Sequence, residues 1–383
     1  MARKRSARSS WDEAEFEYSA LEAELEVFGA EGPDVLEGLA GIAGRYPDFY
    51  PALLDLGLRQ LHFADPVEGE ANLLRGLELF WRRPEPGTKR QRLESALNVV
   101  LNLQDAFRFD LTAPFLRETL ERHPGEAEFW SELARAHAML GRFEKAGEAS
   151  AKAVALKPGK AALWVNKAAV ALDAERLDEA EAALDRAASL RDARATEALA
   201  ENRQTLAYLR RNGGTRLKYL LRPRDQEPDA EDADRNSDRL LAMGLERLRD
   251  GLVAPFAARK RTLVAFFDFA GRGLLEERVP LYEDVHELDD LEEILNSFVI
   301  RHADGGEALG EIAEALSDFY GFLAGHGLMA QRDLVRLVKA VARLVPKVAD
   351  RARRYRAARS KDPGRERARL IEEIFGRKHR ECF

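Results

Sequence analysis

The sequence predicts an all-α protein: a solenoid of helical repeats, followed by a second small helical bundle and a basic helical tail. The chain of 383 residues is rich in Ala, Leu, Glu and Arg, which are good helix formers. Long alternating runs of Val, Ile and Thr, which would indicate strands, are nearly absent. Part of the N-terminal half also resembles itself at a fixed spacing, which is the signature of a repeat architecture.

Composition and length narrow the class of protein. Apolar residues make up 45% of the chain and charged residues 33%, a balance typical of a globular protein with a solvated surface. The single cysteine, Cys382, excludes an internal disulfide framework and a cysteine-based zinc site. The basic N-terminus leads into an acidic segment that begins at Trp11, and not into an apolar core. It is therefore not a secretory signal. No stretch reaches the roughly 18 apolar residues of a membrane span, so we expect a cytoplasmic protein.

The repeat is clearest between residues 127 and 194. Trp130 and Trp164 lie 34 residues apart, and Phe143 and Leu177 have the same spacing. A proline ends the first of these two units, at Pro158. Small residues recur at the same interval where two helices would cross; they are Ala146 with Ala180 and Ala153 with Ala187. These positions predict two amphipathic helices per unit, with the alanines and tryptophans as packing residues.

This pattern resembles the tetratricopeptide repeat (TPR), in which a helix pair of about 34 residues carries a large aromatic, small crossing residues and a closing proline. The resemblance implies a stack of helix pairs with a concave groove, and a non-enzymatic scaffold that binds protein partners.

The repeat domain is expected to cover residues 16–212, after a basic and acidic arm at 1–15. The clearest repeats are 127–160 and 161–194, and the segment from Leu93 to Pro124 fits a third. An earlier unit begins at Tyr50, and its second helix is expected over 68–81. Before it, helices over 11–28 and 35–43 would form a degenerate first unit that ends at Pro47. A final helix from Ala195 to Arg211 should cover the end of the stack and stop at Gly213.

The groove should be lined by the first helix of each unit, and its exposed face is mostly apolar. Such a groove favours an amphipathic helix or an apolar peptide of a partner, although the chain's own segments would also fill it. On this face of the groove, Arg135 is the only basic residue that would bind the C-terminal carboxylate of a partner. The candidate groove residues are Leu58, Asn98, Leu101, Arg135, Asn166, Ala169 and Leu172.

The second half begins with an acidic linker at 213–239, followed by a helical bundle at 240–346. Apolar residues at helical spacing predict helices from Leu240, from Leu263, over 288–299 and over 309–323, and a fifth helix that ends at Pro346. Three features of this bundle resemble the SAM-like core-binding domain of tyrosine recombinases: an aromatic helix at 266–269, the segment from Glu287 to Leu295, and a helix that ends at 319–323. That family's catalytic set has no counterpart here, so the resemblance implies DNA contact at most.

The tail at 347–383 is basic. Between 343 and 380 it carries fourteen Lys or Arg against five acidic residues. These residues predict either a helix that contacts nucleic acid phosphates or a solvated helix that complements acidic surface elsewhere. The candidate contacts are Arg351, Arg353, Arg354 and Arg356. A short apolar stripe beyond Pro363 should dock on this chain or on a partner, and the role of Cys382 is left open.

No catalytic motif occurs in the sequence. The histidines are scattered without metal-ligand spacing, and His286-Glu287 lacks the second histidine of a metalloprotease helix. We therefore expect no enzyme activity, no cofactor and no metal. The leading hypothesis is a protein-binding scaffold, and the alternative is a nucleic-acid-associated factor that uses the second half.

Overall fold

The computed structural model describes residues 2–28, 33–63, 66–82, 88–222, 232–249, 260, 262–264, 266, 291–292, 294–296, 305–361 and 367–375. Within these ranges the regular elements are helices, and no strand occurs. The chain forms two compact units: the first reaches Tyr219, and the second begins at Leu220, apart from a short piece from Arg247 that groups with the first. The predicted all-α fold class is confirmed. No described helix is long and apolar enough to cross a membrane.

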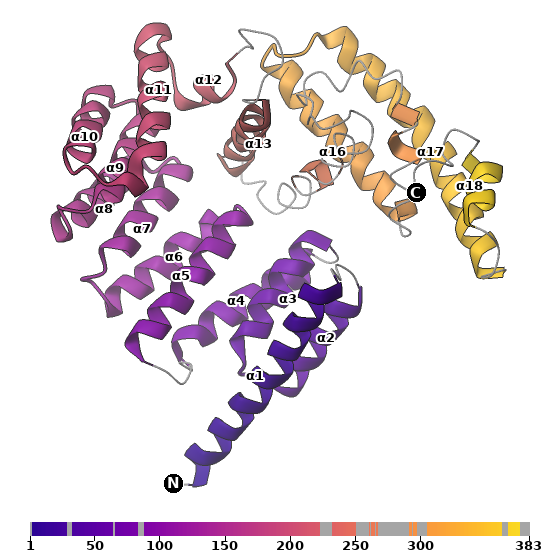
Figure 1. Ribbon diagram of the computed structural model, residues 1–383, viewed down its shortest axis with the longest axis horizontal. Helices are drawn as coiled ribbons and strands as arrows, with labels where there is room; N and C mark the ends of the chain where they lie inside the picture. Colours follow the sequence, from indigo (N-terminus) through magenta and orange to yellow (C-terminus); the bar gives the residue numbers. More distant parts are fainter. Residues whose placement is uncertain are drawn as a thin grey trace. The chain divides into compact units, whose positions relative to one another are not determined.

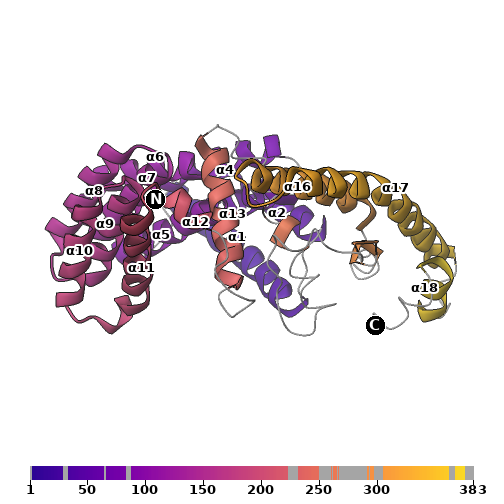
Figure 2. The same ribbon diagram turned by 90° about the horizontal axis from the view of Figure 1, so that it is seen from above.

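The first unit is a stack of antiparallel helix pairs in which successive helices pack against one another (Figures 1 and 2). The helices are α1 (Ala2–Phe28), α2 (Pro33–Arg45), α3 (Tyr50–Phe63), α4 (Pro66–Arg82), α5 (Lys89–Asp105), α6 (Phe109–Arg122), α7 (Ala127–Met139), α8 (Phe143–Leu156), α9 (Ala161–Asp173), α10 (Leu177–Ser189), α11 (Thr196–Asn212) and α12 (Arg216–Leu220), with a 3₁₀ turn at Ala193–Ala195. The expected helix-pair solenoid is therefore present, including the expected second helix at 68–81.

The 34-residue repeat also appears in the backbone conformation. The turn between the two helices of a pair contains a residue in the left-handed conformation at Phe107 (φ 58°), Gly141 (φ 69°) and Glu175 (φ 60°), each 34 residues from the next. The residue that follows each turn is an arginine, whose N–H donates to a carbonyl five residues earlier at 2.7–2.8 Å. Glycine adopts the left-handed conformation at little cost in free energy, and other residues adopt it at a higher cost. The turn geometry is therefore kept at Phe107 and Glu175, although these residue types do not favour it.

The tryptophans and alanines have the packing role that the sequence predicts. Trp130 and Trp164 are half-buried and pack against a cluster that includes Ala127, Ala153 and Leu163. The alanines at the crossing points are buried, which lets the paired helices approach closely.

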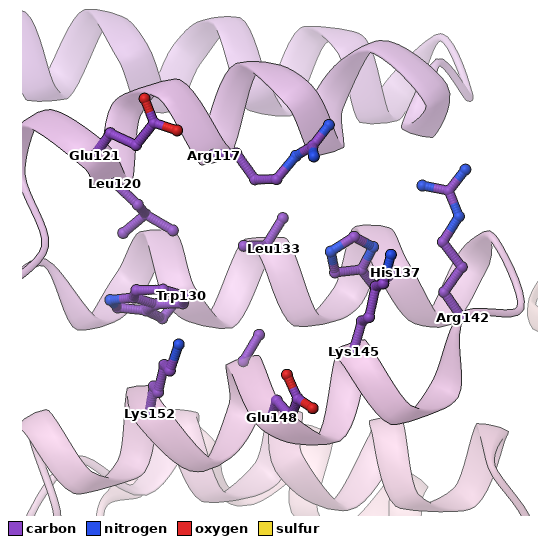
Figure 3. Close-up of a pocket in the computed structure, with 11 residues that line it drawn as sticks. Arg117, Leu120, Glu121, Trp130, Leu133, His137, Arg142, Lys145, Glu148 and Lys152 are labelled. Carbon is purple, nitrogen blue, oxygen red and sulfur yellow. The ribbon is translucent and has the colours of Figure 1, made fainter.

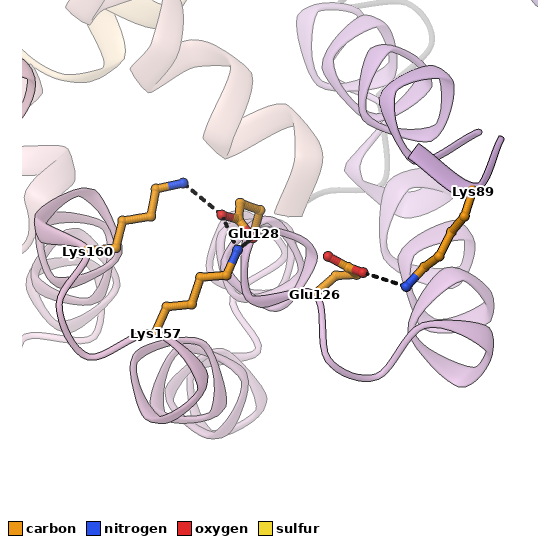
Figure 4. Close-up of polar contacts among 5 residues, drawn as sticks. All are labelled: Lys89, Glu126, Glu128, Lys157 and Lys160. Carbon is orange, nitrogen blue, oxygen red and sulfur yellow. Dashed lines mark hydrogen bonds and ion pairs between the residues drawn. The ribbon is translucent and has the colours of Figure 1, made fainter. Parts of the chain in front are cut away.

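Ion pairs join neighbouring units at the starts of their first helices (Figure 4). Lys157 and Lys160 both donate to Glu128, each at 2.8 Å, and Lys89 donates to Glu126 at 3.0 Å. Partial burial of Glu128 opposes its ionisation, but the hydrogen bonds from the two lysines outweigh that effect and lower its pKa to about 2. The carboxylate therefore holds the loop after α8 against α7.

The pair α3 and α4 crosses at two glycines. A Cβ atom on Gly57 would lie 2.7 Å from the backbone nitrogen of Leu73 and 2.8 Å from the carbonyl oxygen of Gly69. A Cβ atom on Gly69 would be equally close to the backbone of α3. The two backbones therefore meet at a distance that excludes any side chain.

The N-terminal helix α1 packs on the stack, and the end of the segment expected as an arm belongs to the same helix. Ala14 is completely buried, and the Trp11 ring lies 4.8 Å from that of Phe49 in an edge-to-face arrangement. Tyr46 donates to Glu17 at 2.8 Å. The boundary expected at residue 15 therefore falls inside α1, because Trp11 and Ala14 belong to the same buried stripe as residues further along the helix.

Helix α11 ends the stack as expected. Leu206 and Leu209 are buried, while most of its other residues are exposed. Gly213 ends the helix in a left-handed conformation, and its N–H donates to Leu209 at 2.8 Å.

In the second unit the structure describes α13 (Asp232–Arg249), α16 (Gly305–Gly325), α17 (Gln331–Lys361) and α18 (Arg367–Phe375). The acidic segment expected as a linker to residue 239 already becomes helical at Asp232, where Arg222 and Asp238 form a 2.6 Å ion pair. Pro346 does not end a helix as predicted: it lies inside α17. The expected boundary between bundle and tail therefore falls within one helix, because packing on both sides of the proline carries the helix through it.

Parts of the predicted bundle lie outside the described residues. They include most of the segments expected as helices from Leu263 and over 288–299, which carry two of the three features that resemble the recombinase domain. Cys382 also lies outside the described residues.

Candidate functional site

A cavity of about 450 Å³ lies among α1, α3 and α5. Both α3 and α5 are first helices of their pairs, so the cavity lies on the face where the groove was expected. Its volume is within the range of sites that hold small ligands or anchoring side chains. Its apolar lining consists of Trp11, Phe49, Tyr50, Pro51, Leu54, Leu58, Leu73, Val99 and Leu103.

Contacts among four aromatic residues position α1 along this cavity. The ring of Trp11 contacts those of Phe49 and Tyr50 at 4.8 and 5.6 Å, and the ring of Tyr18 lies 5.7 Å from Phe49. The helix therefore forms one wall, and α3 and α5 form the rest. Because the contacts are aromatic and spread over two turns of α1, the wall has a fixed position.

Most of the charged residues in the lining are acidic. Asp55 is paired with Arg59 at 2.9 Å, one helical turn along α3, and Glu15 and Glu22 of α1 add two further carboxylates. Burial raises the pKa of the Tyr18 hydroxyl, and the negative charges of Asp55 and Glu22 raise it further. Tyr18 is therefore a neutral hydrogen-bonding group beside an acidic wall, which suits a partner that carries a positive charge.

Two asparagine amides line the cavity on the side formed by α5. Asn98 and Asn102 are one turn apart on α5, both are exposed, and neither side chain has a hydrogen-bond partner among the described residues. An amide offers both a donor and an acceptor, so the pair matches the backbone of a bound segment. By contrast, Asn166 on α9 donates to Ser131 at 2.9 Å and is already occupied.

The structure brings together only two of the predicted groove residues, since Leu58 and Asn98 alone line the cavity. Leu101 is 43% exposed on α5 outside it, and Arg135 is exposed on α7. Ala169 on α9 is partly buried. The expectation that Leu172 projects into the groove is wrong: its side chain is fully buried, because it packs inside the stack of α9 and its neighbours.

Sequence reasoning missed the contribution of α1 and of Asn102. A signal was available, because Trp11, Ala14, Tyr18 and Leu21 follow one another at spacings of three or four residues, which places them on one helical face. That stripe starts before the boundary expected at residue 15.

The four arginines proposed for nucleic acid are not equivalent. Arg351 donates to Glu292 at 2.8 Å and to Asn296 at 3.2 Å, and Arg353 pairs with Asp350 at 3.4 Å. Arg354 is exposed and Arg356 is partly exposed, and neither has an ion-pair partner among the described residues.

The tyrosine of the same basic helix is not available for stacking on a base. Tyr355 is buried, and its ring lies 5.7 Å from that of Phe375. The apolar stripe of α18, which includes Leu370 and Ile371, is buried as well, so it docks on this chain.

The described residues contain no group of three or more His, Cys, Asp or Glu side chains that would hold a metal ion.

No protein-family model matches the chain, and no curated protein matches it. Among solved structures, the crystal structure of the P58(IPK) TPR domain is similar over 89% of this chain and 89% of that chain, with 16% sequence identity and a TM-score of 0.25. So low a TM-score carries no argument about a site or a partner. The geometry of the helix pairs, with their 34-residue period, shows an all-α helical-repeat solenoid.

Proposed function

We propose that the chain is a non-enzymatic interaction scaffold that binds an amphipathic helix or peptide of a partner protein in the cavity among α1, α3 and α5. The observation that carries the proposal is the combination of an apolar lining with two unpaired amides and an acidic rim. Apolar anchors would supply the affinity, the amides would bond the partner's backbone, and a lysine or arginine of the partner would meet the carboxylates.

A peptide selection on the purified protein tests this proposal. Selected peptides should share an apolar anchor with a basic residue one helical turn away, and they should bind with a 1:1 stoichiometry. Leu58→Glu should weaken binding more than tenfold, because it places a charge on the apolar lining. Asn98→Ala should weaken it less, by the loss of one hydrogen bond, about 1 kcal/mol.

A matched control is available on α4. Val67 is 80% exposed and does not line the cavity, so Val67→Glu adds the same charge without touching the site. Equal binding by the Leu58→Glu and Val67→Glu proteins would contradict the proposed site. Failure of the parent to select any peptide would favour the view that the chain's own segments occupy the groove.

The alternative function is contact with nucleic acid through the arginines of α17. It is favoured by Arg354 and Arg356, which are at least partly exposed and have no ion-pair partner among the described residues. Its distinguishing mark is a steep loss of affinity with rising salt, because phosphate contacts release counterions. A DNA titration at two salt concentrations, with the Arg354→Gln and Leu58→Glu proteins side by side, separates the two functions.

A further inference from the structure

A second cavity, of about 440 Å³, lies away from the groove, among α6, α7 and α8. It is lined by four cationic side chains and two carboxylates, a net charge of +2 when its histidine is neutral. Figure 3 shows that the charged groups are not evenly spread: Arg117, His137, Arg142 and Lys145 gather at one end, and Trp130 lies at the other.

His137 is the first unusual feature of this cavity. The residue is only 6% exposed, and its buried Nδ1 atom has no hydrogen-bond partner among the described residues. Buried polar groups are almost always paired. The matching position of the next repeat, 34 residues on, is Ala171, which is also buried. The fold therefore accepts a small apolar residue at this place, and packing alone does not call for an imidazole.

The arginine after the turn is the second feature. It recurs at 108, 142 and 176, and two of the three guanidinium groups are held by this chain. Arg108 pairs with Asp110 at 2.8 Å and with Glu70 at 3.0 Å. Arg176 donates to the Phe143 carbonyl at 3.0 Å and pairs with Glu179 at 3.3 Å.

Arg142 has no such partner among the described residues, although it occupies the same turn. The residue that would match Glu179, the partner of Arg176, is Lys145 in this repeat. The change from an acid to a base removes the internal counter-ion and adds a second cation. Similarly, Arg117 stands where the next repeat has Ala151. The cavity thus brings together three cations that have no ion-pair partner among the described residues: Arg142 and Lys145 from one repeat, and Arg117 from the repeat before it. One repeat further on, the matching positions hold Arg176, Glu179 and Ala151.

The other end of the cavity combines an apolar surface with two charged side chains, Glu121 and Lys152 (Figure 3). Leu120, Leu133 and the ring of Trp130 form the apolar surface, and the ammonium group of Lys152 lies over the Trp130 ring at 4.4 Å from its centre. A ligand that fits both ends would carry a compact negative charge on an apolar or aromatic body.

We propose that this cavity is a binding site for a small organic phosphate monoester, with the phosphate held by Arg117, His137, Arg142 and Lys145 and the organic group against Trp130, Leu120 and Leu133. A phosphate dianion would neutralise the charge of the lining, and guanidinium groups match its oxygen atoms in geometry. The volume of about 440 Å³ lies in the range of small-ligand sites, which favours a small molecule over a segment of a larger chain.

The pKa of His137 reflects its burial and the cations around it. Burial lowers its pKa, and the positive charges of Arg142, Lys145 and Arg117 lower it further; Glu121 and Glu148 are the only carboxylates in the lining. A bound phosphate would oppose these effects and raise the pKa, because it stabilises the imidazolium form. Ligand binding near pH 6 should therefore be accompanied by proton uptake at this ring.

Titration of the full chain with phenyl phosphate at pH 7.5 tests the proposal. We expect 1:1 binding with a submillimolar Kd, and binding of inorganic phosphate at least fivefold weaker because it lacks the ring. His137→Ala and Lys145→Glu give the residues that the next repeat has at the same positions, so both proteins should fold. His137→Ala should weaken binding about tenfold, and Lys145→Glu should weaken it more than tenfold.

Arg211→Ala is the matched control, since Arg211 is an exposed arginine outside the cavity without an ion-pair partner among the described residues; it should leave the Kd unchanged. Proton NMR of the His137 ring should show its pKa rise by about one unit with saturating ligand. Unchanged affinity in both cavity variants, or no saturable binding by the parent, would overturn the proposal. Binding of a phosphopeptide without binding of phenyl phosphate would overturn the assignment to a small molecule.

Discussion

The indole nitrogen of Trp164 donates a hydrogen bond of 2.9 Å to the carbonyl oxygen of Pro158, the proline that closes the preceding repeat. Trp130 forms the same bond to Pro124, also at 2.9 Å. Each tryptophan therefore ties the start of one repeat to the end of the one before. The ring packs and the nitrogen fixes the loop, so the residue has two separable roles.

The first prediction separates these two roles. Trp164→Phe keeps a ring but removes the donor, and it should lower the free energy of unfolding by about 1 kcal/mol, the usual worth of one hydrogen bond. Trp164→Ala should cost about 3 kcal/mol, the low end of the range for tryptophan, because the ring is only half-buried. Urea denaturation measures both. Equal losses in the two variants would show that the bond, and not the ring, carries the stability.

The second prediction concerns the left-handed turns. Gly141 and Glu175 occupy matching positions with φ of 69° and 60°. Gly141→Ala should destabilise by about 1 kcal/mol, because alanine is strained there. A Cβ at that position would meet no neighbour within 4 Å, so the loss would be one of backbone conformation. Glu175→Gly should instead stabilise by about 0.5 kcal/mol. Changes of the same sign in thermal denaturation would contradict this account.

The third prediction is a pH dependence. The pKa of Glu128 is lowered to about 2, so the folded state prefers its ionised form. Its stabilising contribution is fully present above the ordinary pKa of about 4.5 and is lost as the pH falls from there towards 2. Glu128→Gln should therefore lower stability at pH 7 and have a shrinking effect below pH 4.5. Glu144→Gln, in the first turn of α8, controls for the loss of a carboxylate that has no ion-pair partner in the described part of the chain.

The fourth prediction concerns the crossing of α3 and α4. Gly57→Ala should destabilise by about 3 kcal/mol, because the new methyl group would meet backbone atoms that cannot move aside without separating the helices. Gly44→Ala provides the comparison: it adds the same methyl group in α2, where nothing lies within 4 Å. That variant should be neutral or slightly stabilising. Similar denaturation midpoints for the two proteins would rule out the close approach at Gly57.

The sequence predicted the fold well where the repeat is regular. The spacing of Trp130 and Trp164 predicted the helix pairs, and Gly213 predicted the end of α11. Local patterns of this kind succeed because the same packing geometry selects the same residue types in each repeat.

The groove was predicted less well, because helical periodicity says which face is apolar and not what covers it. Leu172 was placed in the groove, but its face is buried by neighbouring helices. Trp11 and Tyr18 were left out, because only the fold brings α1 to α3 and α5. Pro346 was read as a helix end, yet tertiary packing on both sides keeps α17 continuous. The ion pair between Arg351 and Glu292 could not be predicted either, because the two residues are distant in sequence.

The polar outer surface of α11 has a consequence for how copies of this protein behave at high concentration. Each helix pair presents an apolar flank that another pair can cover, so an uncapped end would be an exposed apolar surface that drives self-association. Leu206 and Leu209 cover that flank, and Arg203 and Arg210 of the same helix pair with acidic residues of α10. A chain truncated before Thr196 should therefore self-associate with rising concentration in a sedimentation experiment, whereas the capped stack should not.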